Sequence, residues 1–307
     1  METGASRVPA AGTHGGDGPA VARALGLDPA DLLDLSQNLN PFAPDPAEVV
    51  RRNLGALGHY PDDRAATGLL AERLGVDPGR LLLTNGGSEA ITLVAAELAG
   101  GVRSEPEFAL HPRDPDPARP HGPRWRSNPH SPTGRLAGPE ETADVWDEAF
   151  HALATGAWTA GREDGAVVVG SLTKTFACPG LRLGYVVARD EAERERLAAR
   201  QPHWSVGALA LACLPDLLGA ADLPGWSRRV ADARRELVDL LSAHGLTVQA
   251  ADAPWVLVDA PGLRDRLAPR GVLVRDCASF GLPGVARVAV PDADGLSCLE
   301  RALLRSG

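Results

Sequence analysis

The sequence contains a single lysine, Lys174, in a chain that has 31 lysine and arginine residues in total. A guanidinium stays protonated and cannot act as an amine nucleophile, whereas a lysine amine can lose its proton and form a Schiff base with a carbonyl compound. The chain uses arginine at all the remaining Lys or Arg positions and has kept a single lysine amine. This predicts a covalent role for Lys174.

The residues around Lys174 indicate where that amine lies and what it binds. Residues 166–169 are apolar and mostly β-branched, which predicts a short buried strand, and residues 170–175 predict a polar loop. Lys174 then follows the carboxyl end of a strand, the edge of an open α/β sheet where ligands bind. The hydroxyl of Ser171 and the cation of Arg182 suit a phosphate. A carbonyl compound that carries a phosphate is expected, namely pyridoxal 5′-phosphate.

The segment Ser171-Leu172-Thr173-Lys174, followed by Arg182 in GLRLGY, resembles the cofactor segment of fold-type I pyridoxal-phosphate aminotransferases. The resemblance implies an α/β fold: a large domain with a mainly parallel sheet flanked by helices, and a smaller α+β C-terminal domain. It also implies a homodimer in which the two subunits share each active site. An alternative is the S-x-x-K motif of serine acyltransferases, with Ser171 as the nucleophile, but those enzymes need a later K-T-G and the chain has no second lysine.

Length, charge and cysteine usage restrict the classes of function. With 307 residues and 44% hydrophobic residues, the chain can bury a large core and is expected to form two lobes. A net charge of −9 argues against a nucleic-acid partner, because such binding rests on a basic face. The four cysteines are far apart and indicate neither a zinc site nor a disulfide framework, so no metal is expected. Without a signal peptide or a run of about 18 apolar residues, a cytoplasmic protein with no membrane partner is predicted.

The first 45 residues have little periodicity and are expected to form an N-terminal arm. They contain His14-Gly15-Gly16 and, at residues 35–41, LSQNLNP. Such residues commonly form turns and caps. The combination is nevertheless similar to the start of threonine-phosphate decarboxylases of cobalamin synthesis, and less closely to that of histidinol-phosphate aminotransferases. In that group the arm lies over the active site, which makes His14 and Asn38 candidate substrate contacts.

A phosphate cradle is predicted between a strand at residues 80–84 and a helix at residues 90–98. The connecting residues, NGGSE at 85–89, let backbone N–H groups converge at the positive end of the helix dipole. They are similar to the G-N-G-x-T/S-E segment of the family. The cofactor contacts implied here are Gly87, Ser88 and Glu89.

Tyr60 follows a predicted helix at residues 46–57 and stands in the turn HYPD. By resemblance, Tyr60 reaches across a dimer interface to the cofactor phosphate of the other subunit. The simpler interpretation is a tyrosine that anchors its own loop.

Three residues are expected to contact the cofactor ring. Phe108, in PEF, resembles the aromatic residue that stacks on the pyridine. Ser131, in SNPHSPTG, stands where the family has an asparagine that contacts the 3′-oxygen. Asp147, in VWDEAF, resembles the aspartate that pairs with the pyridine nitrogen and makes the ring a better electron sink. Without the resemblance, Asp147 could be part of a solvated acidic helix turn.

Two internal stretches are shorter or less regular than the family pattern. Residues 111–126 are rich in Pro, Arg and Asp without apolar periodicity, and only about a dozen residues separate Gly134 from Asp147, too few for a helix and a strand. The fold is therefore expected to be internally abbreviated.

The large cofactor-binding domain is predicted at residues 46–205 and the small domain at 206–307. Within the latter, helices are expected at residues 209–218 and 226–244. Arg275, in RDCASF, resembles a substrate-binding motif of the decarboxylases, and Arg287, in RVAV, resembles the arginine that holds the substrate carboxylate through a bidentate fork.

Three functions remain open at this level, with Lys174 and Asp147 as catalytic residues. Decarboxylation of L-threonine O-3-phosphate to aminopropanol phosphate is favoured by H-G-G and R-D-C-x-x-F. Transamination of the histidinol-phosphate type uses the same cofactor contacts. A degenerate, non-catalytic homologue is suggested by the gaps and by Ser131. The bond broken at Cα depends on which substituent stands perpendicular to the ring, and the sequence does not encode that directly.

Overall fold

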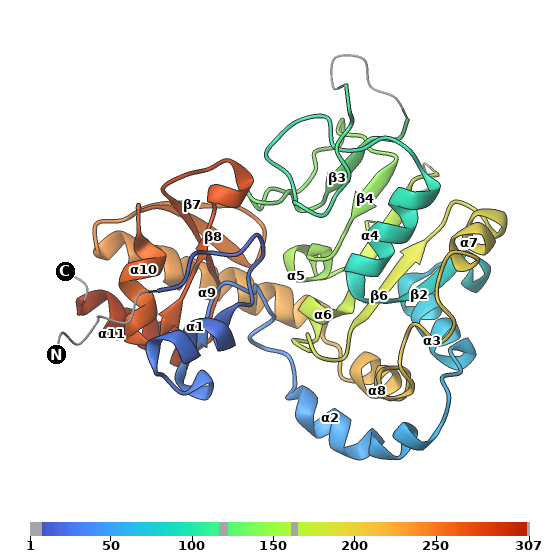
Figure 1. Ribbon diagram of the computed structural model, residues 1–307, viewed down its shortest axis with the longest axis horizontal. Coiled ribbons are helices and arrows are strands. Elements are labelled where there is room, and N and C mark those ends of the chain that lie inside the picture. The colour runs from blue at the N-terminus through green and yellow to red at the C-terminus, as the bar shows by residue number, and fades with distance from the viewer. Residues whose placement is uncertain (1–7, 117–121, 161–164, 306–307) are drawn as a thin grey trace.

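The computed structural model describes residues 8–116, 122–160 and 165–305, which form two lobes (Figure 1). The large lobe contains a five-stranded sheet in the order β2-β6-β5-β4-β3. The strands are β2 (Leu81–Asn85), β3 (Trp125–Ser127), β4 (Val145–Asp147), β5 (Val167–Ser171) and β6 (Leu183–Val187). β3, β4 and β5 pair in parallel, while β6 runs antiparallel to both β2 and β5. Four of the five strands therefore run in one direction, as expected for a mainly parallel sheet.

Both faces of this sheet are covered by helices, and the apolar residues of β5 show how. Val167 and Val169 pack with α4 (Gly86–Glu97) and α7 (Glu191–Ala198), whereas Val168 packs on the opposite face with α3 (Arg64–Leu74) and α8 (Ala208–Gly219). Successive side chains of a strand point to opposite faces, so a continuous valine run is what a strand buried on both sides requires.

The sheet places one glycine where no side chain fits. Gly170 of β5 pairs with Tyr185 of β6, and a Cβ on Gly170 would lie 2.0 Å from the Tyr185 ring. The ring therefore lies directly over the backbone one residue before Ser171. This close packing fixes the end of β5, from which the functional segment continues.

The small lobe contains an antiparallel sheet in the order β10-β11-β8-β7. Its strands are β7 (Thr247–Ala250), β8 (Trp255–Asp259), β10 (Arg275–Asp276) and β11 (Val285–Ala289), and its helices are α9 (Leu223–Ala243), α10 (Leu263–Leu267) and α11 (Ala293–Leu304). This is the α+β arrangement expected from the sequence. The segment with α1 (Gly18–Leu25) and β1 (Leu33–Asp34) also packs here, because β1 pairs in parallel with β9 (Val272–Leu273).

The predicted helix at residues 46–57 is present as α2 (Pro46–Asn53) followed by a 3₁₀ turn, Leu54–Gly58. The apolar core of the large lobe continues through α8 into Leu223 and Trp226 at the start of α9. The domain limits at residues 205 and 206 remain a prediction. The helix α8, which follows that limit in the chain, shares its core with α2 and α3 of the large lobe.

The described residues of the two irregular stretches form no helix, and within the first stretch only residues 125–126 belong to a strand, β3. Residues 135–144 contain no helix or strand. Residues 98–116 and 122–124 contain none either, and isolated β-bridges are their pairings with neighbouring segments. The loop after Ser131 instead binds the small lobe: the Trp255 indole donates to the Pro132 carbonyl at 2.7 Å, and the Leu136 N–H donates to Asp252 at 2.9 Å. The shortened loop thus fixes the two lobes to each other.

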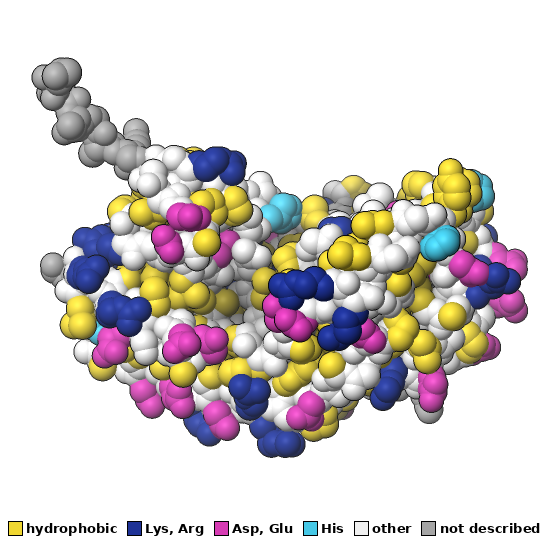
Figure 2. Space-filling view, turned by 90° about the horizontal axis from the view of Figure 1, so that it is seen from below, with side chains coloured by type: hydrophobic (Ala, Val, Ile, Leu, Met, Phe, Trp, Pro, Cys, Tyr) yellow, Lys and Arg dark blue, Asp and Glu magenta, His cyan; other side chains and the backbone are white. Residues whose placement is uncertain are grey.

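Among the described helices none is both long and apolar enough by itself to cross a membrane, and the one pair that qualifies together, α8 and α9, is bent by 81°. On the face seen in Figure 2, basic and acidic side chains are interspersed, and no large field of one sign forms there.

Candidate active site

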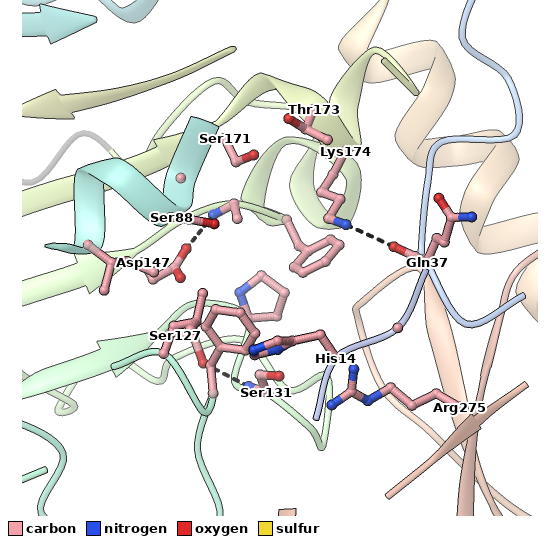
Figure 3. Close-up of a pocket in the computed structure, with 18 of the residues that line it drawn as sticks. His14, Gln37, Ser88, Ser127, Ser131, Asp147, Ser171, Thr173, Lys174 and Arg275 are labelled. Atoms are coloured by element: carbon pink, nitrogen blue, oxygen red, sulfur yellow. Dashed lines mark hydrogen bonds between the residues drawn. The ribbon is translucent and has the colours of Figure 1, made fainter. Parts of the chain in front are cut away.

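A cavity of about 320 Å³ lies where the large lobe, the small lobe and the N-terminal arm meet (Figure 3). Its volume is in the range typical of sites for small molecules. Most of the residues singled out from the sequence line it. They are His14, Gly87, Ser88, Phe108, Ser131, Asp147, Ser171, Lys174, Arg182, Arg275 and Arg287.

Lys174 lies in α6 (Leu172–Thr175), a single helical turn directly after β5 where a loop was expected. Its Nζ donates a hydrogen bond to the Gln37 carbonyl at 3.0 Å and lies 5.9 Å from the centre of the Phe150 ring. Burial, followed by the positive charges of Arg287, Arg182 and Arg275, lowers the pKa of Lys174 to about 8, while Asp34 acts in the opposite direction. At neutral pH roughly one amine in ten is then unprotonated, which a nucleophile requires.

The turn from β2 into α4 lies where the cradle was predicted, although the helix begins at Gly86 and not at residue 90. Gly86 has φ +76°, and a Cβ there would lie 2.3 Å from the Arg182 guanidinium; a Cβ on Gly87 would lie 3.3 Å from Ser171. The glycines, the guanidinium and the hydroxyl therefore surround one small space at the N-terminus of a twelve-residue helix. Such a space suits a phosphate.

Arg182 has an unusual backbone conformation, with φ +57°. For a residue with a Cβ this left-handed conformation costs about 1–2 kcal/mol. Strained residues of this kind cluster at functional sites, where the surroundings hold them. Here the strain accompanies a guanidinium that lies against the cradle.

Glu89 and Tyr60 do not line the cavity of this chain. Glu89 accepts hydrogen bonds from the Asn85 N–H at 2.7 Å and from Gln201 and Ser205, so it caps α4 and holds the cradle from behind. Its expected role as a direct cofactor contact remains a prediction. Tyr60 is 79% exposed, with its ring 4.8 Å from Trp204. Its predicted contact with a second subunit remains a prediction.

Asp147 ends β4 and is only 8% exposed, so the alternative of a solvated helix turn is wrong. Its Oδ1 accepts from the Ala149 N–H at 2.9 Å, and its Oδ2 lies 3.0 Å from Nε2 of His111. These contacts aim the carboxylate into the cavity. His111 was not identified from the sequence: its side chain is fully buried, and its contact with Asp147 spans 36 residues, which no local pattern reveals.

Phe108 and Ser131 lie beside this carboxylate. The Phe108 ring packs edge-on against His111 at 5.5 Å and also approaches His14 at 5.8 Å. The Ser131 N–H donates to Ser127 Oγ at 2.8 Å, and the Ser127 N–H donates to the buried Glu107 at 3.0 Å. Ser131 is thus held at the cavity wall, where its hydroxyl stands in place of the larger amide of the family pattern.

Arg275 and Arg287 face the cavity from the small lobe. They are directly paired across β10 and β11 and are 5% and 7% exposed. Arg287 lies over the Trp255 ring at 5.0 Å, and burial together with Arg275 lowers its pKa to about 9. Two buried like charges repel each other, and an anion placed beside them relieves that repulsion. The pair therefore forms a site for anionic groups.

Asn38 stands behind this pair and is not part of the cavity wall. With its amide oxygen turned toward the guanidinium, it accepts from Arg287 Nε at 3.1 Å and Nη2 at 3.0 Å. This contact orients Arg287, and the expected contact of Asn38 with substrate remains a prediction. His14, by contrast, stands at the cavity mouth, where partial burial and then Arg275 lower its pKa.

Comparison with known proteins agrees with this geometry. The sequence model of the aminotransferase class I and II family matches residues 125–299, more than half of the chain. The chain belongs to this family. Histidinol-phosphate aminotransferase 2 of Methylococcus capsulatus is 30% identical to it, with 89% of this chain and 90% of that protein covered.

Two solved structures show the fold of this aminotransferase-family protein. Histidinol-phosphate aminotransferase from Sinorhizobium meliloti, in complex with pyridoxal-5′-phosphate, superimposes with a TM-score of 0.77 at 16% identity, covering 94% of each chain. L-threonine-O-3-phosphate decarboxylase from Porphyromonas gingivalis gives 0.70 at 23% identity, covering 89% of this chain and 99% of that one. The fold is therefore that of fold-type I pyridoxal-phosphate enzymes. Because the chain belongs to the aminotransferase class I and II family, the protein is a pyridoxal-phosphate-dependent enzyme.

The residues of this cavity fit that cofactor. Lys174 supplies the amine, the glycine cradle with Ser171 and Arg182 suits the phosphate, and Asp147 suits a protonated ring nitrogen. When bound, pyridoxal phosphate supplies an electron sink for negative charge at the substrate Cα. Because all these groups line one cavity, the arrangement does not favour a non-catalytic homologue.

Proposed function

We propose that the enzyme decarboxylates a phosphorylated amino acid, with L-threonine O-3-phosphate as the model substrate. The observation that carries the proposal is the adjacent buried pair Arg275 and Arg287. Because Arg182 is assigned to the cofactor phosphate, Arg275 and Arg287 are the two cations that remain for the substrate. A carboxylate and a phosphate on one small molecule match both.

The charge balance supports a substrate with two anionic groups. A substrate with one anion leaves one of the two buried guanidiniums without a counter-charge, and an uncompensated buried charge costs several kcal/mol. Binding energy from the distant phosphate can in turn hold the carboxylate out of the plane of the cofactor ring. That orientation is what loss of carbon dioxide requires.

Each of the chain's own groups has a task in this proposal. Arg287, oriented by Asn38, holds one anion of the substrate, and Arg275 holds the other. Lys174, with its pKa lowered to about 8, returns a proton to the substrate Cα after carbon dioxide has left. The arm with His14 covers the cavity mouth and limits the entry of water.

A second candidate is transamination, and the names of the curated relatives favour it. The same cation pair would hold the amino donor and then an oxo acid in a second half-reaction. The two proposals differ in the fate of the carboxylate and of the amino group, and not in the residues that bind.

One assay separates them. The enzyme loaded with pyridoxal phosphate is given O-phosphothreonine, with and without 2-oxoglutarate, and both carbon dioxide and transfer of the amino group are followed. Decarboxylation predicts carbon dioxide without any need for the acceptor, and unphosphorylated threonine as control should react far more slowly. Turnover that requires the acceptor and releases no carbon dioxide would refute the decarboxylase proposal and establish the aminotransferase.

A further inference from the structure

The first described segment of the N-terminal arm, residues 8–17, is held against the small lobe by two arginines that come from different elements. Arg264 of α10 donates through Nη1 to the Pro9 carbonyl at 2.7 Å and through Nη2 to Asp17 Oδ2 at 3.0 Å. Arg275 of β10 donates to the Thr13 carbonyl between these two points. Figure 1 shows this arm, at the blue end of the colour scale, running along the small lobe.

Arg264 is buried although it contacts neither the cavity nor the reacting groups. It is 5% exposed, whereas Arg266, two residues further along the same helix, is exposed. A buried guanidinium is retained at a cost in desolvation, so its fork must be matched by acceptors. Both of the stronger acceptors, at 2.7 and 3.0 Å, belong to the arm, while the contact with the exposed Asp265 is 3.5 Å long.

The two contacts of Arg264 bracket the residue that reaches the cavity. Pro9 and Asp17 lie on either side of His14, whose ring approaches Phe108 of the large lobe at 5.8 Å. Next to it, the Gly16 N–H donates to Ser36 Oγ at 2.9 Å, and a Cβ on Gly15 would lie 2.1 Å from the Ser36 carbonyl oxygen. Residues 10–14 are exposed and form no helix or strand, so the two fixed ends and the Arg275 contact at Thr13 decide where this stretch lies.

We infer that Arg264 is a positioning residue for substrate binding. It binds both ends of the segment 8–17 and thereby holds His14 and the Thr13 carbonyl against the anion site at Arg275. The inference rests on the proposed function for the identity of the substrate. Loss of the clamp should raise the KM for the phosphorylated amino acid about tenfold, the usual effect of losing one charge-assisted hydrogen bond. The kcat and the affinity for pyridoxal phosphate should change less than twofold, because no cofactor contact involves Arg264.

The experiment compares Arg264→Gln with Asp17→Asn, which removes the same ion pair from the side of the arm, and with Arg264→Lys, which can satisfy one acceptor at a time. Arg266→Gln is the matched control, because it removes an arginine from the same helix without touching the arm. Hydrogen exchange of the cofactor-free proteins reports on the arm directly. The Gly16 amide, which donates to Ser36 Oγ, should exchange faster in Arg264→Gln and Asp17→Asn than in wild type, with Arg264→Lys intermediate and Arg266→Gln unchanged.

Steady-state kinetics of the loaded enzymes complete the test. Unchanged exchange in both Arg264→Gln and Asp17→Asn would overturn the clamp, whatever the substrate is. Faster exchange with an unchanged KM would overturn the positioning role. If wild type turns over no phosphorylated amino acid, the proposed function fails by itself. Inorganic phosphate titrated into the loaded proteins then decides the inference: weaker binding to Arg264→Gln than to Arg266→Gln supports it, and equal binding refutes it.

Discussion

The cofactor side and the substrate side of the cavity are built in different ways. On the cofactor side, the polar groups follow the ends of strands: Gly86 and Gly87 follow β2, Asp147 ends β4, and Lys174 follows β5. On the substrate side, Arg275 and Arg287 depend on partners from the arm, Thr13 and Asn38. The sheet therefore fixes the cofactor side, which explains how it can persist with shortened loops. The substrate side depends on how the arm and the small lobe meet, and can change with them.

The largest effect that tests this comparison is expected from Lys174→Arg. The variant keeps the positive charge and removes the amine, so turnover should fall at least about a thousandfold, because an amine that attacks and transfers protons has no substitute here. Borohydride reduction of the wild-type protein with pyridoxal phosphate, followed by mass spectrometry, should place the adduct on Lys174. An adduct at the N-terminal amine instead would show that Lys174 does not bind the cofactor covalently.

Arg287→Gln should damage the substrate side alone. Loss of a buried bidentate contact costs about 1.5–3 kcal/mol, so the KM for the phosphorylated amino acid should rise about a hundredfold. Pyridoxal phosphate titrations should show nearly unchanged affinity, and Arg287→Lys, which keeps charge without the fork, should recover only part of the loss. If cofactor affinity fell as far as substrate affinity, the division into two sides would be wrong.

The pKa of Lys174 measures how strongly the two sides interact. In the cofactor-free protein, with a pKa of about 8, the rate at which the amine reacts with a lysine-directed reagent should rise about tenfold from pH 7 to a plateau above pH 9. Arg287→Gln removes a positive charge and should shift this profile to higher pH. Because the unfolded lysine titrates near 10.5, folding releases its proton between about pH 8 and 10.5, and stability should rise with pH across that window relative to Lys174→Met.

Peptide mapping assigns the label to Lys174 and separates it from the N-terminal amine. A reaction profile centred near pH 10.5 in the folded protein would show that neither burial nor the arginines act on this amine.

The smallest effect is expected from Tyr60→Phe, which tests whether the cofactor side is complete within one chain. If Tyr60 of one subunit contacts the cofactor phosphate of the other, loss of its hydroxyl should weaken pyridoxal phosphate binding about fivefold, the value of one hydrogen bond. His59→Gln, at the exposed neighbouring residue, is the control and should bind normally. Sedimentation should show a homodimer. A fully active monomer would mean that Tyr60 serves only its own loop.

The features predicted correctly from the sequence are those that a few neighbouring residues determine. The valine run identified β5, and glycines between an apolar strand and an apolar-periodic helix identified the cradle. Asp147 itself was singled out by resemblance, without its place at the end of β4. In each case strand, turn and functional residue lie within about ten positions, so local propensity and burial act on the same segment.

The features that were missed depend on contacts between distant segments. His111 reaches Asp147 across 36 residues, and the Gln37 carbonyl meets Lys174 across 137. Asn38 meets Arg287 from a distant part of the chain, and Glu89 accepts from Gln201 and Ser205 across 112 and 116 residues. A single sequence contains no periodic signal for such contacts, since packing of the whole chain creates them.

The helix α9 has a consequence for how the molecule melts. Leu223 and Trp226, in its first turn, are buried in the core of the large lobe, while Leu237 and Leu241, three turns later, are buried in that of the small lobe. One continuous helix therefore contributes apolar residues to both cores. If either lobe loses its packing, apolar surface is exposed on a helix that the other lobe also packs against. Because both cores share this helix, we expect the two lobes to unfold together, and a substitution that loosens the small lobe should also lower the stability of the lobe that binds the cofactor.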